Sequence, residues 1–115
     1  MEQTPIYLGT SSWTAAGRER AFYPPKSKKA DFLAFYAGRF NSVEIDSTFY
    51  RIPTTKTVQQ WRERTPEGFI FAAKLPQSIT HEKCLAGTEG ELNEFVGVMD
   101  LLGQRLGPLL MQMTL

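Results

Sequence analysis

The chain has 115 residues, enough for one small domain, and its hydrophobic content of 42% and charged content of 22% are ordinary for a globular protein. Its formal net charge of +1 gives no electrostatic reason to expect nucleic acid or an anionic membrane as a partner. The single cysteine, Cys84, excludes an intramolecular disulfide and a cysteine-based metal site. The N-terminal residues lack a signal-peptide pattern and no apolar run is long enough to span a membrane, so we expect a cytoplasmic protein.

Four short apolar runs predict β-strands, because each is rich in β-branched or aromatic residues and is bounded by Gly, Pro, Ser or Asn. They are IYLGTSSW (residues 6–13), SVEIDSTF (42–49), FIFAAKLP (69–76) and PLLMQMTL (108–115).

Helical patterns separate these strands at residues 29–40, 54–65 and 89–107. Strands that alternate with helices predict a parallel sheet with right-handed crossovers. The connection at residues 14–28 is long, and long ordered loops in compact domains are often functional.

Polar residues gather toward the carboxyl ends of the predicted strands. Taking alternate residues of each strand, we place on one face Thr10, Ser12, Glu44, Asp46, Thr48, Lys74, Gln112 and Thr114. We expect the opposite, mostly apolar face to contact the helices, with Met99, Met111 and Met113 filling the core. Because ligands of parallel α/β folds bind beyond the carboxyl ends of the strands, we predict a polar site there.

Two carboxylates in one buried strand require partners, because unpaired charges are costly inside a protein. Glu44 and Lys74 lie on consecutive strands, so we predict an ion pair between them, with Asp46 extending the cluster toward the open end. The pair has two interpretations: it organises the barrel interior, or it belongs to a functional site.

Several segments together resemble the YecE-like family, catalogued as domain of unknown function 72. The resemblance rests on GTSSW (9–13), FYP (22–24), the F..VEIDSTFY pattern (40–50), Pro53, Trp61, TP (65–66), the F.F..K.P pattern (69–76), TH (80–81) and LGPLLMQ (106–112). The matched polar positions are Thr10, Ser11, Trp13, Glu44, Asp46, Ser47, Thr48, Tyr50, Lys74, Thr80, His81 and Gln112.

This resemblance implies an α/β fold of the TIM-barrel, (βα)n type. A whole barrel needs about 250 residues. We therefore expect residues 1–115 to be the N-terminal half of such a domain, truncated to a partial barrel of about four parallel strands and three helices. A doubly wound four-stranded sheet is the alternative fold.

The resemblance implies a site but no reaction. By analogy of fold, we predict an enzyme acting on a small polar or phosphorylated metabolite. One alternative is a non-catalytic ligand- or partner-binding domain, or an inactive remnant. Another is a metal-assisted phosphodiester hydrolase, in which Glu44, Asp46 and His81 would provide part of a Mg²⁺ or Mn²⁺ site. We also expect that open sheet edges favour self-association.

We predict catalytic roles for Glu44, Asp46, Lys74 and His81, the last as a proton carrier, since histidine exchanges protons near neutral pH. The predicted ligand-binding residues are Thr10, Ser11, Ser12, Trp13, Thr48, Tyr50 and Gln112. No cofactor is identified and no residue is assigned as a metal ligand. For Trp13, Phe22, Tyr23 and Tyr50, an aromatic wall of the site and simple packing of the long loop remain equal alternatives.

Overall fold

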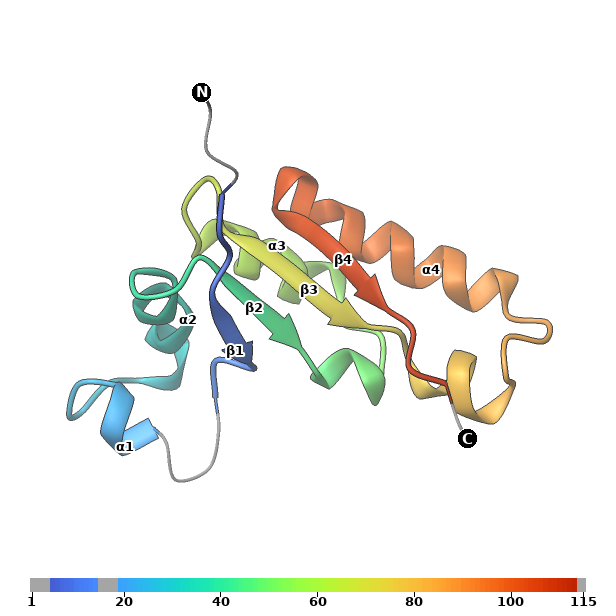
Figure 1. The fold of residues 1–115 in the computed structure, drawn as a ribbon, viewed down its shortest axis with the longest axis horizontal. Coiled ribbons are helices and arrows are strands. Elements are labelled where there is room, and N and C mark those ends of the chain that lie inside the picture. The colour runs from blue at the N-terminus through green and yellow to red at the C-terminus, as the bar shows by residue number, and fades with distance from the viewer. Residues whose placement is uncertain (1–4, 15–18, 114–115) are drawn as a thin grey trace.

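A four-stranded parallel sheet forms the centre of the computed structural model, which describes residues 5–14 and 19–113 (Figure 1). The strands are β1 (Gly9–Ser11), β2 (Ser42–Ile45), β3 (Ile70–Lys74) and β4 (Leu106–Leu110), and they lie in the order β1-β2-β3-β4. The α-helices are α1 (Glu19–Phe22), α2 (Lys29–Ala37), α3 (Thr55–Glu63) and α4 (Glu89–Met99). None of the helices in the described part of the chain combines the length and apolar character needed to cross a membrane.

The strand order decides between the two expected folds. A doubly wound sheet reverses its strand order at one point, so that helices cover both faces. Here each strand pairs with the next one along the chain, and right-handed crossovers then place every helix on the same face. The doubly wound alternative is therefore wrong, and the chain has the architecture of a partial barrel.

The predicted elements end earlier than expected from the sequence, and the strand expected at 108–115 is Leu106–Leu110. The strand expected at 42–49 stops at Ile45, and a 3-10 turn, Ser47–Phe49, follows it. The helix expected at 89–107 ends at Met99, and a 3-10 stretch containing Gly103 at φ +60° leads into β4. Of the strand expected at 6–13, only Gly9–Ser11 forms.

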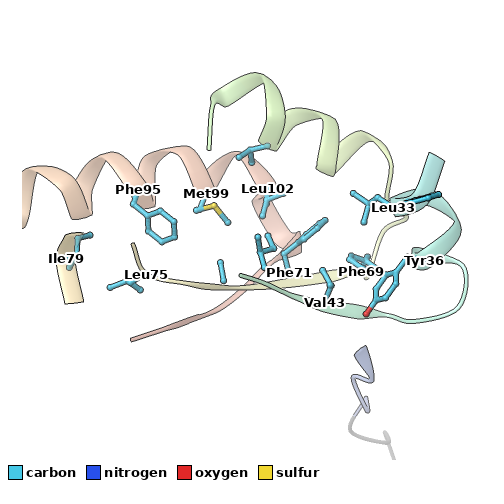
Figure 2. Close-up of a cluster of buried hydrophobic side chains, with 14 of the residues drawn as sticks. Leu33, Tyr36, Val43, Phe69, Phe71, Leu75, Ile79, Phe95, Met99 and Leu102 are labelled. Atoms are coloured by element: carbon cyan, nitrogen blue, oxygen red, sulfur yellow. The ribbon is translucent and has the colours of Figure 1, made fainter. Parts of the chain in front are cut away.

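The core lies between the sheet and the helices that cover it. Phe71 of β3 points toward the stretch after α4, and Phe69, just before β3, lies beside Tyr36, as Figure 2 shows. Phe95, Met99 and Leu102 are fully buried in the same core. Burial of each such side chain contributes about 1.5–3 kcal/mol before entropic losses. Met99 is a core residue as predicted, whereas Met111 and Met113 are 49% and 42% exposed, because the sheet ends at β4 before reaching them.

The register corrects the predicted face of the first strand. Ser11 is level with Glu44, which is level with Ala72, whereas Thr10 is level with Val43. Neighbouring residues in register point to the same face of a sheet. Ser11 therefore shares the face of Glu44, and Thr10 belongs to the helix-covered face.

Candidate functional site

Asp46 and Lys74 meet where β2 and β3 end. Lys74 is the last residue of β3, and Asp46 comes directly after β2. The Lys74 Nζ atom lies 3.9 Å from Asp46 Oδ1, and both side chains are partly exposed. Oδ1 itself is buried and has no hydrogen-bond partner, so the contact is a long ion pair rather than a hydrogen bond. The ammonium group therefore keeps capacity to bind a further anion.

Thr48 joins the two strand ends. Its side chain is buried, and its hydroxyl donates a hydrogen bond of 2.7 Å to the carbonyl oxygen of Lys74, with the Ile45 carbonyl 3.2 Å away. Because Thr48 lies in the 3-10 turn after β2, this bond attaches that turn to the end of β3. The predicted ligand-binding residue Thr48 thus has a positioning role: it fixes the backbone that carries Asp46 and Lys74.

Phe49 connects Lys74 with His81. The Lys74 Nζ atom lies 5.9 Å from the centre of the Phe49 ring, within the range of a cation–π contact. The His81 ring meets the same phenyl ring edge to face, with 5.0 Å between ring centres. Phe49 was not among the predicted site residues, and its position in the apolar end of VEIDSTFY gave no signal beyond that of a core residue.

His81 is oriented by its neighbour. It lies in a π-helical turn, Ser78–Glu82, and its Nδ1 atom is 2.8 Å from the hydroxyl oxygen of the fully buried Thr80. Either atom can be the donor. In both cases Nδ1 is engaged, which leaves Nε2 as the ring nitrogen that can exchange a proton with a ligand.

The loop that carries His81 is attached to α4 by an ion pair. The Lys83 ammonium donates to the Glu91 carboxylate in the first turn of α4. This hydrogen bond, with a second from Ser78, lowers the pKa of Glu91 below its ordinary value of 4.5. The charged carboxylate near the N-terminus of α4 is also favoured by the helix dipole.

Glu44 does not pair with Lys74, so the predicted ion pair is wrong. Lys74 instead pairs with Asp46, because the chain turns into a 3-10 helix after Ile45 and the strand alternation no longer applies to Asp46. Glu44 is half-buried on the sheet face that the helices leave uncovered, together with Ser11. It forms no ion pair with any residue in the described part of the chain.

The residues in and just after β1 do not extend the site. The Thr10 hydroxyl lies 3.0 Å from the Tyr36 hydroxyl on the helix-covered face. Ser12 adopts φ +65°, and its hydroxyl accepts a hydrogen bond from the Thr14 N–H. Trp13 packs edge to face against Trp61, with 5.6 Å between ring centres.

Aromatic residues of the long loop belong to the core rather than to a wall of the site. Phe22 and Tyr23 pack edge to face against each other and contact the rings of Phe35 and Phe32 in α2. Tyr50 is exposed and touches Phe49 edge to face, so it lies at the border of the site. Gln112 is exposed beyond β4.

The described residues provide no complete set of metal ligands. Within residues 5–14 and 19–113, no three His, Cys, Asp or Glu side chains come together in a way that could hold a metal ion. Glu44, Asp46 and His81 therefore do not come together as the partial Mg²⁺ or Mn²⁺ site of the metal-assisted alternative.

A shallow groove of about 640 Å³ lies at the opposite, N-terminal ends of β3 and β4. It is lined by Gln59, Arg62, Glu63, Thr65, Glu67 and Arg105. Its two arginines are balanced by two glutamates, so its charge favours neither anions nor cations. The ion pair and His81 lie instead at the carboxyl ends of the strands, where ligands bind in this architecture.

Comparison with known proteins identifies relatives of the same fold. The family described as "Protein of unknown function DUF72" matches residues 7–114. The chain is 31% identical over 110 residues to UPF0759 protein YecE of Escherichia coli K12, covering 94% of this chain and 37% of the relative. It is 36% identical over 75 residues to UPF0759 protein YunF of Bacillus subtilis 168, covering 65% of this chain and 26% of the relative.

Solved structures of DUF72 family proteins have the same fold as this chain. The crystal structure of a DUF72 family protein from Thermotoga maritima MSB8 superposes with a TM-score of 0.78 at 30% identity, covering 94% of this chain and 44% of that one. A DUF72 family protein from Enterococcus faecalis V583 gives a TM-score of 0.72 at 26% identity, covering 96% of this chain and 40% of that one. The chain thus spans less than half the length of these relatives.

Proposed function

The chain belongs to the DUF72 family, and we propose that the carboxyl ends of β2 and β3 bind the anionic group of a small polar or phosphorylated metabolite. The proposal rests on the position of Lys74, whose ammonium group lies near both the Asp46 carboxylate and the Phe49 ring without a close hydrogen bond to either. We place this function in the cytoplasm, as expected from the sequence.

Each residue has a defined part in this proposal. Lys74 binds the anion through its ammonium group, which as a compact charge suits a phosphate or carboxylate. Asp46 limits the affinity and orients Lys74. His81 exchanges a proton with the bound molecule through Nε2, since Thr80 engages Nδ1. If turnover occurs, His81 is the general acid or base.

Proton NMR of His81 tests the proposed binding, because His81 is the only histidine of the chain. A ¹³C-resolved proton spectrum therefore contains one ring Hε1 signal. Inorganic phosphate and glycerol 3-phosphate are titrated at fixed pH and ionic strength. We expect a saturable shift of the His81 signal, since the imidazole shares the Phe49 ring with the anion-binding lysine.

Two variants separate specific binding from general charge effects. Lys74→Met removes the proposed anchor and abolishes the saturable shift. Lys56→Met removes an exposed lysine of α3 and leaves it unchanged. A shift that persists in Lys74→Met, or no saturable shift in the unmodified chain, contradicts the proposal.

A non-catalytic binding domain is the alternative that the same ligands distinguish. Because the His81 signal reports binding alone, phosphate release from glycerol 3-phosphate is measured in parallel. Saturable binding without phosphate release in the unmodified chain identifies the site as a receptor for the anion. Release that His81→Gln eliminates identifies an enzyme.

A further inference from the structure

The buried hydroxyl of Thr80 has two acceptors in the described part of the chain. It lies in the π-helical turn Ser78–Glu82, 2.8 Å from Nδ1 of His81 and 3.5 Å from the carbonyl oxygen of Pro76. A hydroxyl carries one hydrogen, so it can donate to only one of these partners. Leaving that hydrogen unpaired in a buried position would be costly, so one of the two acceptors receives it.

The carbonyl of Pro76 is the poorer of the two acceptors. Hydrogen bonds between two oxygens normally span about 2.5–3.0 Å, and the separation of 3.5 Å exceeds this range. The same carbonyl oxygen already accepts from the Ile79 N–H at 3.0 Å and from the Thr80 N–H at 3.3 Å, which uses both of its lone pairs. The hydroxyl hydrogen of Thr80 is therefore directed at Nδ1 of His81.

We propose that Thr80 is a positioning residue that holds neutral His81 in the tautomer with its hydrogen on Nε2. A ring nitrogen that accepts a hydrogen bond carries no hydrogen, so the single hydrogen of the neutral imidazole lies on the other nitrogen. His81 is partly exposed, so its ring can meet a ligand. Towards that ligand, neutral His81 is a hydrogen-bond donor and not a base.

This tautomer defines the kind of ligand group that His81 recognises, and here the inference rests on the proposed function. An oxygen of a phosphate or carboxylate accepts from the Nε2–H, whereas an ammonium group, which can only donate, does not. The His81 ring and the Lys74 ammonium both contact the ring of Phe49. Two donors on either side of one phenyl ring favour an anionic ligand over a cationic one.

Nitrogen NMR of the ligand-free chain tests the tautomer directly. Because His81 is the only histidine, a long-range proton–nitrogen correlation spectrum of the ¹⁵N-labelled 115-residue chain contains one pair of ring nitrogens. At alkaline pH, where the imidazole is neutral, we expect Nδ1 to have the chemical shift of a nitrogen without hydrogen and Nε2 that of a nitrogen with hydrogen. The reverse assignment, or two averaged signals of similar shift, overturns the proposal.

Substitutions of Thr80 show whether its hydroxyl sets the tautomer. Thr80→Val removes the hydroxyl while the Pro76 carbonyl keeps its two N–H donors. The two nitrogen signals of His81 should then move toward each other, as the second tautomer becomes populated. Thr80→Ser keeps the hydroxyl and should retain the single tautomer. Thr80→Ala replaces the valine variant if valine does not fold, and signals that stay in place without the hydroxyl overturn the proposal.

Thr65→Val is the matched control. It removes another buried threonine hydroxyl, which donates at 3.0 Å to the carbonyl of Trp61, four residues earlier in the chain. Thr80 and Pro76 have the same separation in sequence. The nitrogen signals of His81 should stay in place in Thr65→Val, and a shift equal to that of Thr80→Val would show a general effect of hydroxyl loss and overturn the proposal.

A phosphate titration links the tautomer to binding. Thr80→Val should weaken the binding of inorganic phosphate by about twofold to tenfold, because the ring no longer holds its N–H ready for the ligand. Equal affinities of Thr80→Val and the unmodified chain overturn the role of Thr80 in presenting His81. If phosphate does not bind to the unmodified chain, the proposed function fails, whereas the nitrogen spectrum of the ligand-free chain still decides the tautomer.

Discussion

The hydroxyl of Thr48 donates a hydrogen bond of 2.7 Å to the carbonyl oxygen of Lys74. This bond links the turn after β2 to the last residue of β3. It holds the ends of the two strands together, and so keeps the Lys74 ammonium nitrogen 3.9 Å from the Asp46 carboxylate oxygen. The arrangement of the candidate site therefore depends on a buried neutral side chain as much as on its charges.

Replacing Thr48 by valine should destabilise the chain by about 1–3 kcal/mol. Valine keeps the shape but removes the donor, so a carbonyl acceptor at a buried position loses its partner. Urea unfolding followed by circular dichroism measures the change. Thr55→Val at the exposed start of α3 is the control and should stay within about 0.5 kcal/mol of the unmodified chain. Equal effects of the two variants would contradict the assigned role of Thr48.

Asp46→Asn should strengthen phosphate binding at the proposed site. Removing the carboxylate leaves the Lys74 ammonium without its neighbouring negative charge, which for a partly exposed pair is worth up to about 1 kcal/mol, or about fivefold in affinity. The His81 signal provides the binding curve. Asp31→Asn makes the same chemical change on the exposed face of α2 and should leave the affinity as it is. Weaker binding in Asp46→Asn would mean that the carboxylate itself contacts the ligand.

The architecture could be predicted from the sequence because apolar runs and helical periods alternate regularly along the chain. The alternation of strands and helices indicated a parallel sheet, and the structure confirms it. The polar ends of the second and third strands also indicated where Asp46 and Lys74 would lie.

The details of the candidate site could not be predicted because they depend on backbone breaks that periodicity does not reveal. Strand alternation defines two faces, but not which face of one strand matches which face of the next. Thr10 was therefore assigned to the wrong side. The 3-10 turn after Ile45 changed the direction of Asp46, so Lys74 pairs with Asp46 and not with Glu44. The role of Phe49 depends on two distant residues that meet only in the folded chain.

Gly9→Ala should destabilise the sheet, because β1 approaches β2 too closely for any side chain at this position. A Cβ atom on Gly9 would lie 2.0 Å from the backbone oxygen of Ser42, so one of the strands must move. Overpacking of this kind costs about 1–3 kcal/mol. Thermal or urea unfolding measures the loss.

Gly97→Ala is the matched control for this substitution. Apart from its chain neighbours and the backbone of its own helix, no atom lies within 4 Å of a Cβ placed on Gly97, in the last turn of α4. Alanine there should stabilise the chain by about 0.5–1 kcal/mol through its higher helix propensity. If both alanines shifted stability in the same direction, the close approach of β1 to β2 would not be the cause.

Glu91→Gln should reduce the dependence of stability on acidic pH. The Lys83 hydrogen bond lowers the pKa of Glu91 in the folded chain below 4.5, so the unfolded chain binds a proton at this carboxylate more readily than the folded one. The contribution of the pair is then fully present above about pH 4.5 and is lost as the pH falls through the folded pKa. Urea unfolding at a series of acidic pH values should show that the free energy of unfolding falls less steeply for Glu91→Gln than for the unmodified chain. High salt should reduce this difference, because the ion pair is partly exposed. Glu94→Gln removes a carboxylate of the same helix that forms no ion pair with Lys83. An equal change of slope in both variants would show that the acid sensitivity does not come from the Lys83–Glu91 contact.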